Sequence, residues 1–263
     1  MAEGRLLLGK GHCLRRRGRF SSTDQQQRLS MSVNRTQAIR QTIRSTKSEP
    51  SHQEALLALI GEQMPKLHTS IHLPSKNPAG ALVDFIIRYI EHVPNFIDAI
   101  GGLTRAAGIY EYSSIFLTMA EDFFVNPPAV LQKKHGLNAL MAEAYLAHRL
   151  IEEVNDRILS HCGIPLAPMD MTRSNLIVHE LLGEPYANEL DFIVFYATET
   201  HMSRESSMNN AAFHQYVEAH KQHGWKAELD KWPCLAEDLS ISLSFEQTAD
   251  GESVAVPVSR VVH

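Results

Sequence analysis

Histidine and carboxylate side chains recur near the apolar side of several predicted helices. His148 and Glu152 are four residues apart, so on a helix the imidazole and the carboxylate lie one turn from each other. His179 and His201 take similar positions on two further predicted helices, and Glu121 lies near the edge of another apolar face. Helical bundles bind metal ions by turning such ligands inward. We therefore predict a metal site with His148, Glu152 and His179 as the leading ligands and with Glu121 or His201 completing the shell.

Imidazole and carboxylate ligands together suit iron or manganese, which are the metals we expect here. A metal ion with an open coordination position can activate oxygen or water. The sequence thus favours a metal-binding helical bundle that acts as a non-haem iron or manganese oxidoreductase or oxygenase on a small molecule. The arrangement is similar in outline to ferritin-like carboxylate bundles, although the chain lacks the two Glu-x-x-His motifs that those bundles carry.

The alternative is that the histidines are ordinary core residues. A histidine on an apolar helix face is more often hydrogen-bonded to a carbonyl than bound to a metal. In that case the protein is a non-catalytic helical bundle that binds a small apolar ligand or a partner protein in a cleft between helices. The sequence leaves open whether the chain is an enzyme, and it does not indicate the oligomeric state.

Several common motifs are absent from the sequence. There is no glycine-rich phosphate loop, no Gly-x-Ser-x-Gly elbow, no His-Glu-x-x-His and no Cys-x-x-Cys. The three cysteines are Cys13, Cys162 and Cys234, a widely spaced and odd set that fits no disulfide framework and favours a reducing, cytoplasmic compartment. The apolar runs are far shorter than the roughly 18 to 20 residues that a membrane span needs. No membrane span is therefore expected.

Charge divides the chain into a basic beginning and an acidic remainder. Residues 1–50 hold eleven Lys and Arg against three Asp and Glu, whereas residues 51–263 hold 14 against 27. We predict that residues 1–50 are a disordered basic arm, of which at least the first 30 are dispensable for folding. An organellar transit peptide, a nucleic-acid-binding tail and translation from Met31 are the alternatives. Nucleic acid is an unlikely partner, because the acidic body would repel phosphate.

These candidate ligands need helices to position them, and the hydrophobic pattern supplies them. The strongest helical period runs over residues 136–160. Including this segment, we predict an all-α bundle of five or six helices within residues 51–205. The apolar run from Phe192 to Ala197 predicts that the helix of residues 185–204 is buried all round, as a central member of the fold.

The last part of the chain, residues 206–263, is predicted to be an extension that packs on the bundle. It begins with a short helix over about residues 211–223. Residues 239–245 then alternate apolar and polar side chains, which is the pattern of a strand. A turn at residues 249–252 and the valines that follow it predict a small β-hairpin, which would have to dock in order to be stable.

Overall fold

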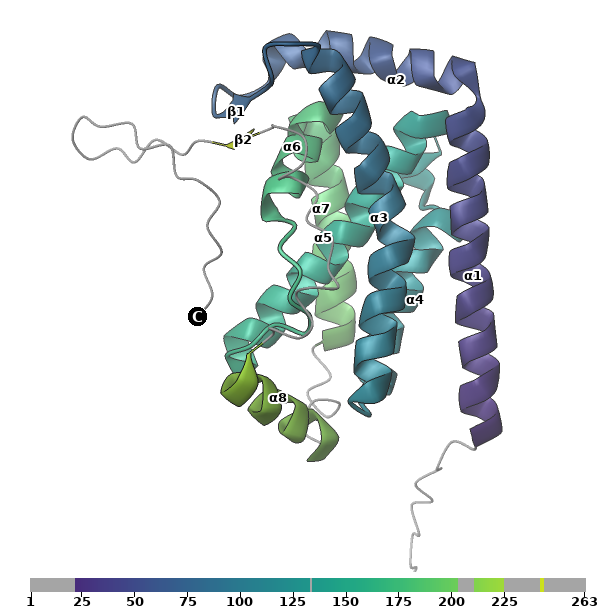
Figure 1. The fold of residues 1–263 in the computed structure, drawn as a ribbon, viewed down its shortest axis with the longest axis vertical. Coiled ribbons are helices and arrows are strands. Elements are labelled where there is room, and N and C mark those ends of the chain that lie inside the picture. The colour runs from purple at the N-terminus through teal and green to yellow at the C-terminus, as the bar shows by residue number, and fades with distance from the viewer. Residues whose placement is uncertain (1–21, 133, 203–210, 225–241, 244–263) are drawn as a thin grey trace, which may run out of the picture.

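The chain forms an all-α bundle (Figure 1). The computed structural model describes residues 22–132, 134–202, 211–224 and 242–243. Six α-helices, α2 to α7, lie where five or six were predicted, so the predicted fold class is confirmed. The α-helices in the described residues are α1 (Ser22–Ser48), α2 (Pro50–Gln63), α3 (Pro78–Ala106), α4 (Tyr110–Val125), α5 (Gly136–Cys162), α6 (Thr172–Leu182), α7 (Glu184–Met202) and α8 (Ala211–His223). Two short 3-10 helices, η1 (Met64–Lys66) and η2 (Ala129–Leu131), complete the helical elements described.

Helix α5 is the centre of the bundle. It packs against α1, α2, α3, α4, α6 and α7, and its residues are buried almost all round between Leu140 and Ile151. Three small side chains, Ala142, Ala144 and Ala147, are completely buried. Short side chains allow neighbouring helices to approach closely, which explains how one helix accepts neighbours on several sides. The helix ends at Gly163, whose φ of 78° is the left-handed conformation that glycine adopts readily.

Helices α6 and α7 form a hairpin that covers one side of α5. The turn is made at Gly183, which has a φ of 86°. Side-chain contacts show that α7 runs parallel to α5, because Arg149 meets Asp191 and Arg157 meets Glu199 further along both helices. Helix α6, before the turn, runs antiparallel to both. The hairpin therefore presents one edge of α7 to α5 over most of its length.

The prediction that α7 is buried all round holds for one side only. Its inward residues are completely or nearly buried, namely Ala187, Leu190, Val194, Thr198 and Met202. By contrast, Phe192, Phe195 and Tyr196 are exposed. The reason is positional: α7 lies at the edge of the bundle, so no described helix covers its outer side.

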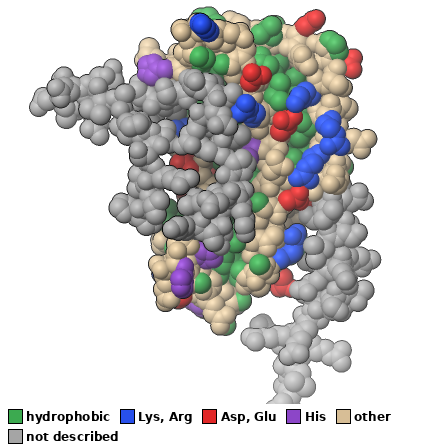
Figure 2. Space-filling model, in the orientation of Figure 1, with side chains coloured by type: hydrophobic (Ala, Val, Ile, Leu, Met, Phe, Trp, Pro, Cys, Tyr) green, Lys and Arg blue, Asp and Glu red, His purple; other side chains and the backbone are tan. Residues whose placement is uncertain are grey.

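The chain before residue 50 differs from the predicted disordered arm. Residues 22–48 form α1, which packs on α3 and α4 and buries Ile39 and Ile43. Ion pairs from three of its basic residues fasten this helix, and Figure 2 shows basic and acidic side chains side by side along this part of the surface. Arg35 pairs with Glu121 at 2.8 Å and also with Asp122, Arg40 pairs with Asp98 at 2.8 Å, and Lys47 pairs with Glu91 at 2.7 Å.

The physical reason lies in the pattern rather than the composition. Two isoleucines at a spacing of four make a narrow apolar stripe, and the cations on either side find carboxylates on α3 and α4. Averaging over 50 residues conceals that stripe. Residues 1–21 lie outside the described part of the chain, so the prediction for them stays a prediction.

Two very short strands join distant parts of the chain. Strand β2 (Ser242–Leu243) pairs antiparallel with β1 (Ile71–His72), with Ile71 opposite Leu243. The strand pattern at residues 239–245 was thus informative, but the partner that the structure describes is β1 rather than the predicted second half of a hairpin. Residues 254–261 lie outside the described residues. Helix α8 matches the predicted short helix and packs through Phe213 and Tyr216. None of the described helices is both long enough and apolar enough to cross a bilayer.

Helix α1 is expected to contribute directly to stability. Replacing Ile39 with Ala removes a completely buried side chain and should lower the free energy of unfolding by about 2 to 4 kcal/mol. Gln41→Ala changes an exposed position of the same helix and is the control. Urea unfolding followed by circular dichroism measures both variants. Equal stability of the two would show that α1 does not belong to the folded unit.

Candidate functional site

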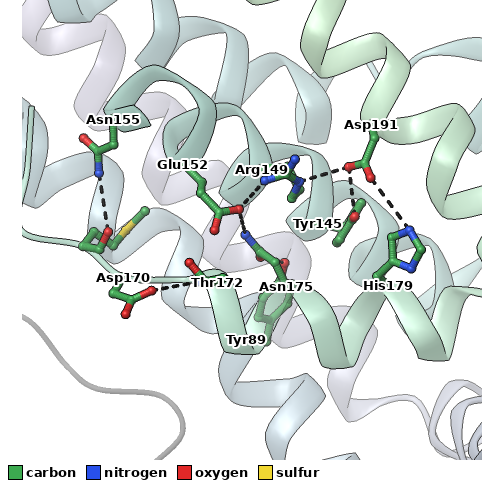
Figure 3. Close-up of polar contacts among 11 residues, drawn as sticks. Tyr89, Tyr145, Arg149, Glu152, Asn155, Asp170, Thr172, Asn175, His179 and Asp191 are labelled. Carbon is green, nitrogen blue, oxygen red and sulfur yellow. Dashed lines mark hydrogen bonds and ion pairs between the residues drawn. The ribbon is translucent and has the colours of Figure 1, made fainter. Parts of the chain in front are cut away.

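A connected set of polar side chains joins α5, α6 and α7 (Figure 3). Its centre is Arg149 on α5. The Nε of Arg149 donates to Oδ1 of Asp191 at 3.0 Å, and Nη1 donates to Oε2 of Glu152. The hydroxyl of Tyr145 also donates to Oδ1 of Asp191, at 2.9 Å. We call the whole set the polar seam, and it comprises Tyr89, Tyr145, Arg149, Glu152, Asn175, His179 and Asp191.

The polar seam continues inward to the core. Nδ2 of Asn175 donates to Oε2 of Glu152 at 2.7 Å, and the hydroxyl of Tyr89 donates to Oδ1 of Asn175 at 2.6 Å. Tyr89 is completely buried, and burial raises the pKa of its hydroxyl well above the usual value. The phenol therefore stays protonated and serves as a donor. Each hydrogen bond described in the polar seam thus joins a donor group to an acceptor group.

A second polar group lies next to Tyr89 in the core. Nδ1 of His92 on α3 and Nε2 of His148 on α5 are 3.1 Å apart, and the two rings are stacked with centroids separated by 5.3 Å. The ring of His148 also lies 4.2 Å from that of Tyr89 and 5.1 Å from that of Phe96. His148 is completely buried and His92 nearly so. This histidine pair links α3 to α5.

Burial keeps the histidine pair neutral. It lowers the pKa of His92 to about 4, and it lowers the pKa of His148 well below the usual value, with the nearby His92 adding to the effect. The backbone of Ala144 acts on the pKa of His148 in the opposite sense. A neutral imidazole has one N–H donor and one acceptor nitrogen, so two neutral rings can share the bond between His92 Nδ1 and His148 Nε2.

The residues predicted to bind metal lie in four different places. Glu152 and His179 both belong to the polar seam, where His179 Nε2 is 3.8 Å from Oδ2 of Asp191 and 3.3 Å from Oδ1 of Asn188. His148 belongs to the histidine pair. Glu121 is buried on α4 beside Arg35, and His201 is exposed near the end of α7. The structure brings Glu152 and His179 into one network and leaves the other three apart.

The cation that balances the charge of the two carboxylates in the polar seam is an arginine. The guanidinium of Arg149 lies between Glu152 and Asp191, where a bound metal ion would otherwise balance their charge. Within the part of the chain that the structure describes, no group of three or more His, Cys, Asp or Glu side chains is arranged to hold a metal ion. The iron or manganese site stays a prediction, which elemental analysis of the purified protein tests.

Asn155 holds the connection between α5 and α6. Its Nδ2 donates to the carbonyl of Ala167 at 3.1 Å, and its Oδ1 accepts from the amide of Ala167 at the same distance. Both polar atoms of this buried side chain are therefore used to fix the loop. The hydrophobic pattern of residues 136–160 predicts the helix that carries Asn155, but not the loop that this side chain holds.

The exposed side of α7 is the second feature that sequence reasoning missed. Phe192 is 68% exposed, Tyr196 is 67% exposed and Phe195 is 52% exposed. We call these three side chains the aromatic face. Phe195 lies beneath the guanidinium of Arg157, 5.7 Å from the ring centroid, and the same arginine donates to Glu199 at 2.6 Å. The inner edge of α7 is thus fastened by ion pairs while its outer side is open.

Charge around the aromatic face is predominantly negative. Helix α7 contains four acidic residues and no Lys or Arg. Two of the acids share the arginines of α5, whereas Glu184 and Glu189 are exposed and form no ion pair with any described residue. No family model, curated protein or solved structure matches the chain.

The histidine pair should make stability depend on pH. In the unfolded chain His92 has an ordinary pKa of about 6.5, whereas in the folded chain its pKa is about 4. Between these two pH values the unfolded state therefore binds a proton that the folded state does not bind. Stability is therefore lost as the pH falls through this window. At pH 5 the loss due to His92 is about 2 kcal/mol.

The comparison must be made against a variant, because Glu143 acts in the opposite direction. Burial raises the pKa of Glu143 to about 7, which favours the folded state as the pH falls from 7 towards 4.5. The free energy of unfolding of His92→Phe, measured relative to that of wild type, should be higher at pH 5 than at pH 7.5. His201→Leu, at an exposed position, is the control. Parallel pH profiles for wild type and His92→Phe would contradict the neutral pair.

Arg149 is expected to be necessary for the packing of α6 and α7. Arg149→Met leaves the carboxylates of Glu152 and Asp191 without their cation and should lower the free energy of unfolding by about 2 to 4 kcal/mol. Lys66→Met breaks an exposed pair with Glu62 and should cost less than about 1 kcal/mol. Thermal or urea unfolding measures both, and equal small effects would show that the seam does not hold the hairpin.

Proposed function

We propose that the protein is a helical scaffold that binds another protein through the aromatic face of α7. The observation that carries this proposal is the exposure of Phe192, Phe195 and Tyr196 together on one helix. Single exposed apolar residues are ordinary on protein surfaces, whereas contiguous exposed aromatic side chains are typical of binding sites. Aromatic residues are also enriched at the centres of protein interfaces.

The rigidity of α7 supports this proposal. Binding is costly when the interface must first be ordered. Here Arg149 and Arg157 fasten the inner edge of the helix, and Val194 and Thr198 are buried beneath it. The aromatic side chains therefore stand on a helix that is already in place before a partner arrives.

The shape of the surface favours a protein over a small molecule. Small apolar ligands bind in concave sites that enclose most of their surface. The aromatic face lies on the outer side of a helix at the edge of the bundle, and each of its three side chains is more than half exposed rather than enclosed. A second helix or an extended chain that lies along α7 would cover all three rings at once.

A metal-dependent oxidoreductase has less support than this binding function. Its predicted ligands are distributed over four places, and Arg149 satisfies the two carboxylates of the seam. The alternative suggested by the sequence was that the histidines are core residues hydrogen-bonded to carbonyls. His148 does lie in the core, but its partner there is His92.

Selection of peptides against the purified protein tests the proposal. A display library of random peptides, each long enough for about four helical turns, should yield binders to the wild type. Binding should weaken about tenfold or more in the double variant Phe192→Ser/Tyr196→Ser, because exposed aromatic side chains at an interface contribute most of the affinity.

The control removes exposed apolar side chains from other places. Leu57 on α2 and Ile115 on α4 are 49% and 44% exposed, so Leu57→Ser/Ile115→Ser loses a comparable kind of surface away from α7. This variant should bind the selected peptides as the wild type does. A library without binders, or binders that are indifferent to the change of Phe192 and Tyr196, would rule out the aromatic face as the docking site.

A further inference from the structure

We infer that the segment that docks on the aromatic face is a basic amphipathic helix of another protein, with its cationic end over Glu184 and Glu189. This inference rests on the proposed function, because it names the chemistry of the partner at the same surface. Its apolar side would cover Phe192, Phe195 and Tyr196.

Negative charge is in excess where α5 and α7 meet. Each arginine there is shared between two carboxylates: Arg149 pairs with Glu152 and Asp191, and Arg157 pairs with Glu153 and Glu199. The arginines therefore neutralise only half of the carboxylates that surround them. Burial, followed by the nearby charges of Glu152 and Glu153, also raises the pKa of Asp156, as expected where negative charge accumulates.

This negative charge is unevenly distributed along α7. Glu199, near the end of the helix, is already held by Arg157 at 2.6 Å. Glu184 and Glu189, at the beginning, are exposed and form no ion pair with any described residue. Successive turns carry Glu189, Phe192 and Tyr196 on the same side, and at 1.5 Å per residue Glu189 lies roughly 10 Å along the axis from Tyr196. A partner helix would thus meet acid at one end and aromatic rings at the other.

The charge also decides against a second copy of α7 as the occupant. Two such helices face to face would bring the exposed acids of both copies together with no Lys or Arg of α7 to pair with them. Like charges placed opposite each other at an interface disfavour association. A partner with Lys or Arg near Glu184 and Glu189 gains attraction instead, and its approach is accelerated by the acidic surface.

The chain itself already contains one basic helix that packs on an acidic surface. Helix α1 is basic, and it lies on acidic positions of α3 and α4 with Ile39 and Ile43 buried between its cations. Arg40 and Lys47 contact Asp98 and Glu91 there. The same combination of a short apolar stripe and flanking cations would fit α7, where apolar groups and carboxylates are both exposed.

The composition of the selected peptides tests the inference directly. Peptides selected against the full-length wild type should be positively charged, with Lys or Arg gathered toward one end and apolar residues at helical spacing. Net negative or neutral binders would overturn the inference. If such binders still depend on Phe192 and Tyr196, the proposed function stands and only the charge of the partner is wrong.

Neutralising the acids provides the second arm of the experiment. Glu184→Gln/Glu189→Gln should weaken the binding of a selected basic peptide several-fold at low ionic strength, and less at about 0.15 M salt. Glu54→Gln/Glu111→Gln removes two exposed acids on α2 and α4 and should have no effect. Fluorescence anisotropy at both salt concentrations measures the affinities. Equal affinities for wild type and Glu184→Gln/Glu189→Gln would overturn the inference.

Two further outcomes identify other occupants. A concentration-dependent dimer in sedimentation that disappears with Phe192→Ser/Tyr196→Ser would assign the surface to a second copy. A synthetic peptide of residues 1–21 that binds only when Phe192 and Glu189 are intact would assign it to the basic beginning of this chain. Either result would overturn the assignment to another protein. Monomeric protein and no binding by that peptide, together with the expected effects of the acidic variants, would support it.

Discussion

The guanidinium of Arg149 is the constraint on which this side of the bundle depends. It is largely buried between α5 and the hairpin of α6 and α7, and a charge in that environment is tolerated only when it is paired. Glu152 supplies one partner from the same helix, and Asp191 supplies the other from α7. Asn175 then brings α6 to Glu152. One cation thereby sets the positions of three helices, and the outward direction of the aromatic face follows from that arrangement.

The interior of the bundle shows why inward polar residues are ambiguous in a sequence. A carboxylate beside an apolar stripe has the same pattern whether its charge is balanced by a metal ion or by an arginine. For Glu152 the signal was present, since Arg149 precedes it by three residues, at the spacing of a helical ion pair. For His148 the partner is His92, which is 56 residues earlier and on another helix. Helical period predicts that both point inward, but it contains no information about which inward residues meet.

The difference between a local sequence pattern and a contact between distant residues also explains why the observed α1 and α7 differ from the predicted ones. The apolar period of residues 136–160 is long and regular, so the predicted helix agrees closely with the observed α5. In α1 the apolar stripe is narrow, and the burial of Ile39 and Ile43 depends on carboxylates of α3 and α4 that a local pattern does not reveal. In α7 the sequence from Phe192 to Tyr196 reports how apolar the helix is, whereas the bundle determines which of its sides is covered.

The way α1 is fastened also has a consequence for motion. Its ion pairs are partly open to solvent, so salt and water weaken them, and its apolar contact is far narrower than that of α5. Helices of this kind open as separate units while the rest of the protein stays folded. Amide hydrogens of α1 will therefore exchange with deuterium through local undocking, and they will do so faster in high salt. Those in the middle of α5 will exchange only when the whole bundle opens.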